Sequence, residues 1–92
     1  MFRLWGKIWK DNKMLRDTVI CNDDSSMTRT KKVLDGLNQI CYTFDLSVPI
    51  WLDANISEFQ RVSKTRFRTD NFIESIPFDA LEIQVIEEDD LS

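Results

Sequence analysis

Positive charge and aromatic rings gather between residues 51 and 68, and this stretch holds the side chains best suited to bind a partner. In grooves for single-stranded nucleic acid, cations bind the phosphates and the bases stack on aromatic rings. Trp, Phe and Arg are also enriched at the centres of protein interfaces. A third interpretation places Phe67 in the core and pairs the cations with Glu74, Asp79 or the acidic C-terminal tail. The candidate binding residues are Trp51, Arg61, Lys64, Arg66, Phe67 and Arg68.

The residue types that the chain lacks argue against catalysis. There is no histidine, so Ser-His and Cys-His nucleophiles are excluded within this chain, and acid–base chemistry would fall to carboxylates, lysines or Tyr42. Two cysteines cannot fill a structural zinc site, which needs four Cys or His ligands. Two glycines cannot build a Gly-rich phosphate loop. We therefore assign no catalytic residue, no metal ligand and no cofactor, and we expect that the protein is not an enzyme.

Charge is unevenly distributed along the chain, whose net charge is −4. Residues 1–16 hold five cations and one acid, whereas residues 69–92 hold eight acids and no cation. These two ends can pair in the fold, which is the interpretation we favour, or they can present separate faces to a partner. The acidic balance also repels a polyanion, so a nucleic-acid partner is less favoured than a protein.

The length of 92 residues allows a single domain. The longest run without a formal charge, residues 36–44, is far shorter than the ~20 residues that a membrane-spanning helix needs. The first residues lack the apolar run and cleavage site of a signal peptide. We therefore expect a cytoplasmic protein without membrane contact, in which Cys21 and Cys41 are reduced thiols.

Alternating side chains predict a β-hairpin at the start of the chain. Apolar residues recur at alternate positions of residues 2–10, which is typical of a strand with one buried face. Asp11 and Asn12 favour a turn, because short polar side chains bond their own backbone and tolerate positive φ. Residues 13–21 are predicted to form the second strand. Its apolar face consists of Leu15, Val19 and Cys21.

Two tryptophans lie on the basic face of the first predicted strand. Trp5 and Trp9 share that face with Arg3 and Lys7, because successive side chains of a strand point to opposite sides. The two rings could form a binding platform, or they could pack beneath a helix. We favour packing beneath a helix.

Two amphipathic helices are predicted after the hairpin. The polar residues 22–26 offer N-cap oxygens, so the first helix should begin within them. Its apolar stripe consists of Val33, Leu34, Leu37, Ile40, Cys41 and Phe44. Gly36 within this helix suggests that another backbone passes close. The second helix is expected from Asp53 or Asn55 to about residue 64, because Asn55 has the spacing of a capping box. Its apolar side consists of Leu52, Ile56, Phe59 and Val62.

The last segment is predicted to form a strand beside the hairpin. Leu81, Ile83 and Val85 alternate with Glu82 and Gln84, whose side chains should face solvent or the cations of the first strand. We predict an α+β fold in which the N-terminal β-hairpin and the C-terminal strand form one small, mainly antiparallel sheet, covered on one face by two helices. Residues 1–87 form this single domain. Residues 88–92 form an acidic C-terminal tail that is either solvated or in contact with the basic face of the hairpin or with the cations at residues 61–68.

Four sequence words resemble those of small bacterial proteins of about this length and of unknown function. The words are PIWLD at residues 49–53, SKTRF at 63–67, DNFI at 70–73 and LEIQVIEED at 81–89. The resemblance implies a bacterial, cytoplasmic setting. It brings no activity and no functional residue with it.

These observations favour a non-enzymatic accessory or regulatory protein that binds another protein or associates with itself. The alternative is a module that binds single-stranded nucleic acid through the basic and aromatic stretch. An enzyme that relies on carboxylates is the third hypothesis.

Overall fold

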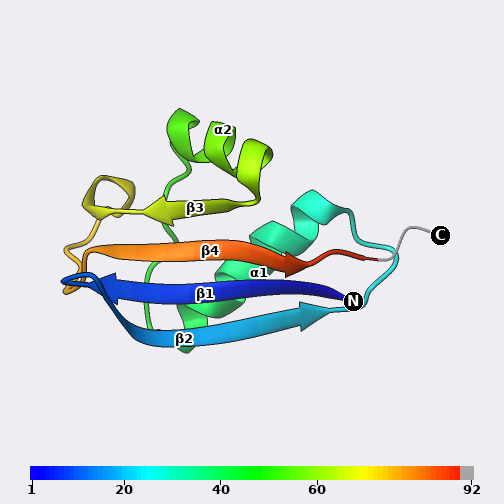
Figure 1. Ribbon diagram of the computed structural model, residues 1–92, viewed down its shortest axis with the longest axis horizontal. Helices are drawn as coiled ribbons and strands as arrows, with labels where there is room; N and C mark the ends of the chain where they lie inside the picture. Colours follow the sequence, from blue (N-terminus) through cyan, green and yellow to red (C-terminus); the bar gives the residue numbers. More distant parts are fainter. Residues whose placement is uncertain (90–92) are drawn as a thin grey trace.

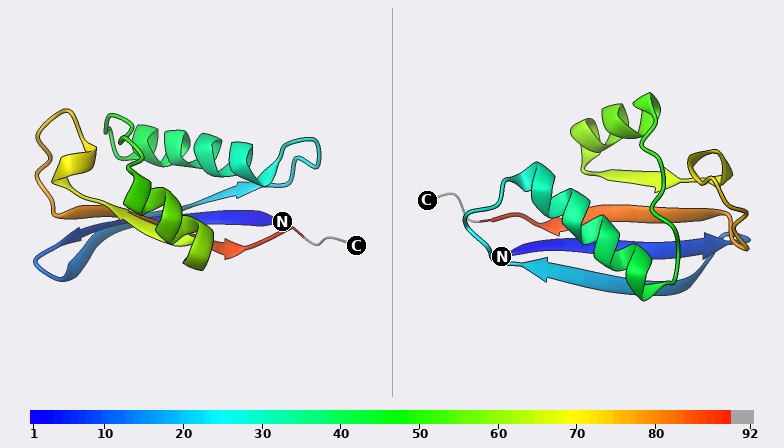
Figure 2. Two further views of the ribbon diagram at one scale, coloured as in Figure 1. Left: turned by 90° about the horizontal axis from the view of Figure 1, so that it is seen from above. Right: turned by 180° about the vertical axis from the view of Figure 1, so that it is seen from behind.

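The computed structural model describes residues 1–89 of the chain. Its elements are β1 (Phe2–Lys10), β2 (Lys13–Asn22), α1 (Arg29–Thr43), α2 (Asp53–Val62), β3 (Lys64–Phe67), a single 3-10 turn (Thr69–Asn71) and β4 (Ala80–Glu87). The strands form one antiparallel sheet in the order β2-β1-β4-β3. Helix α1 covers one face of this sheet, and α2 packs beside β3 (Figures 1 and 2). The predicted α+β fold is confirmed.

The β-hairpin forms as predicted. Asp11 and Asn12 have φ values of 52° and 63°, the left-handed geometry that a two-residue hairpin turn requires. The pairing of β1 with β2 contains a bulge at Leu15, where the register shifts between Ile8 and Trp9. Beyond the bulge, Val19 pairs with Trp5 on the sheet face that lies away from α1, and its side chain is exposed. The predicted apolar face of β2 is therefore not the face that lies beneath α1.

Helix α1 packs unusually close to β1. A Cβ atom on Gly6 would lie 2.6 Å from Ile40 Cγ2, and one on Gly36 would lie 2.9 Å from Leu4 Cδ2. Gly36 therefore accommodates the side chain of Leu4, and the expectation that another backbone passes there was wrong. The predicted stripe of α1 is buried except for Leu34, which is exposed.

Trp5 and Trp9 do not pack beneath a helix, so this prediction was wrong. Side chains along β1 point alternately to the two faces of the sheet, and the positions that face α1 are those of Leu4 and Gly6. The tryptophans lie on the opposite face, which no helix of residues 1–89 covers (Figure 2). We call this the open face of the sheet.

The helix starts differ from the predicted ones. Helix α1 begins at Arg29, after the N-cap Thr28, whose side chain accepts a hydrogen bond from Lys31 N. The expected start within residues 22–26 was wrong, because Asp24 instead closes a local turn by accepting hydrogen bonds from Ser26. Helix α2 begins at Asp53, as one of the two predicted starts.

Two buried amides join α2 to β3, a strand that the sequence did not indicate. Asn55 Nδ2 donates to Thr65 Oγ1 at 2.9 Å and to the Arg66 carbonyl at 3.0 Å. Asn71 Nδ2 donates to Asn55 Oδ1 at 2.7 Å and to the Ile50 carbonyl at 2.8 Å. Because buried polar groups need partners, these bonds hold residues 50–71 in one arrangement.

The basic start and the acidic end of the chain pair, as we favoured. Glu87 accepts from Arg3 Nε at 2.8 Å and from the N-terminal ammonium at 3.1 Å. The tail residue Glu88 binds Arg29 Nε at 3.0 Å, and Asp89 binds Lys32 Nζ at 2.5 Å. Residues 88 and 89 of the predicted tail therefore contact the first turn of α1, and not solvent alone, the hairpin or the cations at residues 61–68 as expected. Residues 90–92 of the predicted tail lie outside the described residues. No helix among the described residues has the length and apolar character needed to cross a membrane.

The core prediction is tested by truncating Ile83 in β4. Its side chain is fully buried, so Ile83→Ala should lower the free energy of unfolding by about 2–5 kcal/mol, as buried aliphatic truncations do. The control is Ile73→Ala, because Ile73 is 89% exposed and should change the free energy by less than about 0.5 kcal/mol. Urea unfolding measures both, and equal effects of the two substitutions would contradict the fold.

Candidate protein-binding surface

The structure does not bring the six predicted binding residues together on one face of the sheet. Phe67 is fully buried on the α1 side, and the Trp51 ring packs edge-on against it with centroids 5.0 Å apart. Lys64 and Arg66 of β3 lie opposite Gln84 and Glu82 of β4. Because opposite residues of paired strands point to the same face, both cations lie on the open face. Arg61 lies on α2, where its side chain is exposed. The aromatic rings and the cations therefore do not form one surface.

Three of the predicted cations do meet at a hollow of about 510 Å³ beside β3. Lys64, Arg66 and Arg68 line it, together with the acids Glu58, Asp70 and Glu82. Three cations face three acids, so this hollow has no excess of positive charge. Of the predicted cations, Arg66 forms an ion pair, and its partner is Glu82 rather than the expected Glu74 or Asp79.

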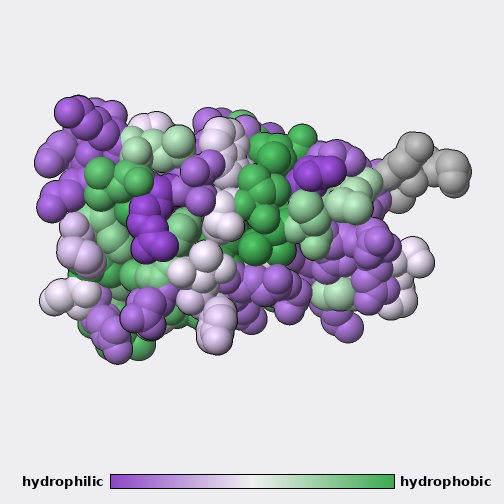
Figure 3. Space-filling model, turned by 90° about the horizontal axis from the view of Figure 1, so that it is seen from below, coloured by the Kyte–Doolittle hydropathy of each residue, from purple (hydrophilic) through white to green (hydrophobic). Residues whose placement is uncertain are grey.

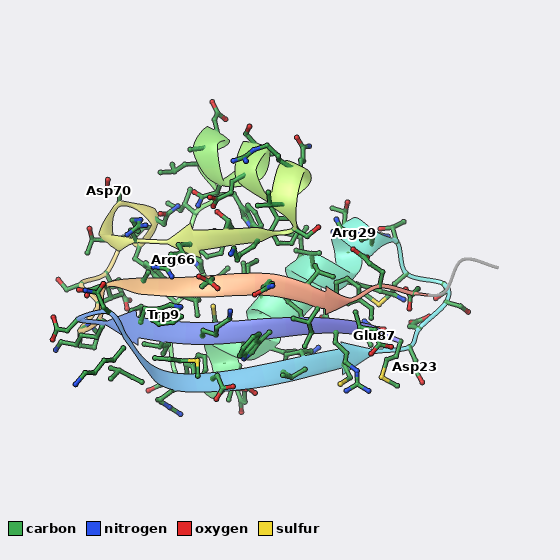
Figure 4. The ribbon with its side chains drawn as sticks, in the orientation of Figure 1. Trp9, Asp23, Arg29, Arg66, Asp70 and Glu87 are labelled. Carbon is green, nitrogen blue, oxygen red and sulfur yellow. The ribbon has the colours of Figure 1, made fainter. Side chains whose placement is uncertain are left out.

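The open face carries a row of alternating rings and charges that crosses three strands. Lys7 Nζ lies 3.8 Å from the centroid of the Trp5 ring, and Arg66 Cζ lies 4.9 Å from that of Trp9. Figure 4 shows Trp9 and Arg66 at the same end of the sheet. Both contacts have the geometry of cation–π interactions. The alternation of Trp and cations in residues 2–10 was the sequence signal for this row.

Glu82 of β4 lies at the centre of this row and is only 3% exposed. Its Oε2 lies 2.7 Å from Lys7 Nζ, and its Oε1 lies 2.7 Å from Arg66 Nε. Lys7 also donates to Gln84 Oε1 at 2.9 Å, so the expectation that these polar residues face the cations of the first strand is confirmed. Burial alone would raise the pKa of Glu82, but hydrogen bonds and charge from Lys7 and Arg66 together lower it. Glu82 therefore stays ionised, with both carboxylate oxygens bonded.

Strand β2 lies at one edge of the sheet, and no other strand of residues 1–89 pairs with its outer side. Its first half is protected against pairing by the bulge at Leu15 and by the charges of Lys13, Arg16 and Asp17. Its second half, from residue 18 to 22, has the sequence TVICN and carries no charge. Figure 3, which views this edge from below, shows hydrophobic patches between hydrophilic side chains.

The opposite edge of the sheet, β3, is much less available. It has four residues, whereas β2 has ten. Its outward-facing Arg66 carbonyl already accepts a hydrogen bond from Asn55, and α2 lies alongside it (Figure 1). The second half of β2 is therefore the accessible strand edge of this sheet.

Both cysteines are free thiols, in agreement with the sequence prediction. Cys41 is buried in the core, and burial raises the pKa of its thiol to about 11. Cys21 is exposed at the end of β2, with its Sγ 3.5 Å from Arg3 Nη1. Within the described part of the chain, no group of three or more Cys, Asp or Glu side chains could hold a metal ion.

The buried ion pairs predict the effect of removing Glu82. In Glu82→Gln, the Lys7 ammonium, whose side chain is 8% exposed, loses its counter-charge, and breaking such a buried pair costs about 3–5 kcal/mol. Glu88→Gln is the matched control, since it breaks a pair whose side chains are 45% and 51% exposed and should cost at most about 1 kcal/mol. Urea unfolding at pH 7 compares them, and a smaller loss for Glu82→Gln would contradict the assignment.

The lowered pKa of Glu82 also predicts how stability depends on pH. A carboxyl with a lower pKa in the folded state stabilises the fold above its unfolded pKa, about 4.3, and this contribution is lost as pH falls through the folded pKa. The free energy of unfolding should therefore fall from pH 5 to pH 3, and it should fall less in Glu82→Gln than in the wild type. Parallel pH curves for the two proteins would refute the prediction.

Comparison with known proteins finds no match that could indicate a function. No family model, no curated protein and no solved structure matches this chain. The arrangement of the open face and of the β2 edge is therefore the basis for assigning a function.

Proposed function

We propose that this protein is a non-enzymatic binding module that adds an extended strand of a partner polypeptide to the outer edge of β2. The observation that carries the proposal is the uncharged second half of β2, from residue 18 to 22, which lies at an open sheet edge. Such an edge presents backbone N–H and C=O groups that an added strand satisfies.

The side chains of this edge support strand addition. Thr18, Val19 and Ile20 are β-branched, and such residues form favourable cross-strand pairs. Val19 is 41% exposed on the open face, while Ile20 is partly buried and packs against the core from the other face. An added strand would therefore find an apolar contact on each face of the sheet, and its backbone would be held between them.

The state of the buried ionisable groups supports a non-enzymatic role. Glu82 is ion-paired with both Lys7 and Arg66 and is only 3% exposed, so a substrate has little access to its carboxylate. Cys41 has a raised pKa and is only 1% exposed, so it is a poor nucleophile. A catalytic acid or base is instead expected to have a pKa near the working pH and an accessible position.

We place this binding in the bacterial cytoplasm, as an accessory or regulatory activity. The exposed free thiol of Cys21 supports a reducing compartment, because thiols in oxidising compartments are usually paired. Binding of single-stranded nucleic acid has less support, because the hollow beside β3 is lined by three cations and by three acids and so has no net positive charge to attract phosphates.

The proposal is tested with a displayed library of random ten-residue peptides. We expect selected peptides to bind the wild type and to lose at least tenfold in affinity against Val19→Lys, which places charge at the edge. They should bind Val62→Lys normally, because Val62 is similarly exposed, at 47%, but lies on α2. N-methylation of alternate peptide amides should abolish binding, since it removes the main-chain donors.

Two results would overturn the proposal. One is a selected peptide set that binds Val19→Lys and the wild type equally. The other is saturable binding of mixed single-stranded DNA or RNA below about 100 μM that weakens steeply with salt, which would instead favour a nucleic-acid-binding module.

A further inference from the structure

We infer that the strand added to β2 is β2 of a second copy of this chain, with a two-fold axis passing through Val19. The inference rests on the proposed function, because it uses the same edge, and it names the partner and the register. The resulting sheet would be continuous, with eight strands built from the four of each copy.

The sequence of β2 favours this register over those centred at Asp17 or Ile20. In antiparallel pairing about Val19, that residue lies opposite its own copy on the open face. Thr18 lies opposite Ile20 on the α1 face, so the pairs at the centre are β-branched and uncharged. A centre at Asp17 would place two carboxylates opposite each other, and a centre at Ile20 would place Asp17 opposite Asp23. Like charges in these positions destabilise pairing.

The same register brings opposite charges together at both ends. Asp17 of the second copy lies opposite Cys21, because both are two residues from Val19. The Arg3 guanidinium already lies at Cys21, with Nη1 3.5 Å from its Sγ. Asp17 Oδ2 accepts from Trp5 Nε1 at 2.9 Å, which leaves Oδ1 for a cation. Two symmetric Arg3–Asp17 contacts therefore flank the apolar centre.

The fold leaves room for the second copy. The C-terminal end of α1 lies over the first half of β2, where Arg16 Cζ is 4.9 Å from the centroid of the Phe44 ring (Figure 2). The second half of β2 is therefore free of α1 on its outer side. Pairing would cover residues 16–22 of each copy, with Arg16 of one copy opposite Asn22 of the other. It would end at the Leu15 bulge.

The register is tested by cysteine cross-linking. In the double variant Val19→Cys with Cys21→Ser, the new thiols face each other across the axis, where opposite Cα atoms lie about 4.5–5.5 Å apart, within disulfide range. The wild type, with its exposed Cys21, is the control for disulfides that form by random encounter of two molecules. In this register the two Cys21 residues are four positions apart, roughly 13 Å along the strands, and cannot be bridged within the dimer. Cys41 is unchanged in both proteins.

We expect mild oxidation to convert the double variant to a covalent dimer at least tenfold faster than the wild type. Non-reducing electrophoresis over time measures both rates. Equal rates, or faster cross-linking of the wild type, would overturn the register and with it the inference.

Sedimentation equilibrium provides the independent measurement. The wild type and Val62→Lys should show a concentration-dependent dimer, whereas Val19→Lys should remain monomeric with an unchanged circular dichroism spectrum. A wild type that is monomeric at all concentrations overturns self-pairing. If library peptides still bind that monomer and lose binding in Val19→Lys, the proposed function stands and only the second copy is excluded as the partner.

Discussion

The structure depends on the need to neutralise one buried carboxylate. Glu82 lies in a central strand, on the face without a helix, and it is ionised. An unpaired buried charge costs several kcal/mol, so the neighbouring strands have to supply cations at the matching positions. Lys7 does so from β1 and Arg66 from β3, which ties three of the four strands together through side chains as well as through backbone bonds. These contacts match the register in which β4 pairs with β1 and β3, where Lys7 and Arg66 both lie opposite Glu82.

This arrangement explains how a sheet can leave one face without a covering helix. The rings of Trp5 and Trp9 and the stems of Lys7 and Arg66 shield the charges that lie between them. The open face is therefore neither an apolar patch nor a free set of charges. Its groups are largely bonded to one another, which is why the β2 edge, rather than the open face, carries the functional proposal.

The two edge strands of the sheet, β2 and β3, differ in how far their outer sides are covered. At β3, α2 and the buried amides Asn55 and Asn71 occupy the outer side of a short strand. At β2, a bulge and charges protect the first half only. Unprotected edges are a liability for aggregation in natural proteins. In the proposed dimer, a self-complementary, uncharged segment that is limited at both ends by charged residues would satisfy this edge through a defined contact.

The sequence by itself determined the elements whose physics is local: the hairpin, the two helices and the C-terminal strand, because alternation, turn residues and helical periodicity depend only on near neighbours. It also indicated the pairing of the charged ends. It did not indicate β3, four residues whose stability comes from β4 and from buried amides distant in sequence. Only the tertiary structure decided that Phe67 is core, that the Trp5 face is open and that β2 is an edge. Strand order is set by non-local packing and by the matching of Glu82 with its cations, and neither can be read from a single stretch of chain.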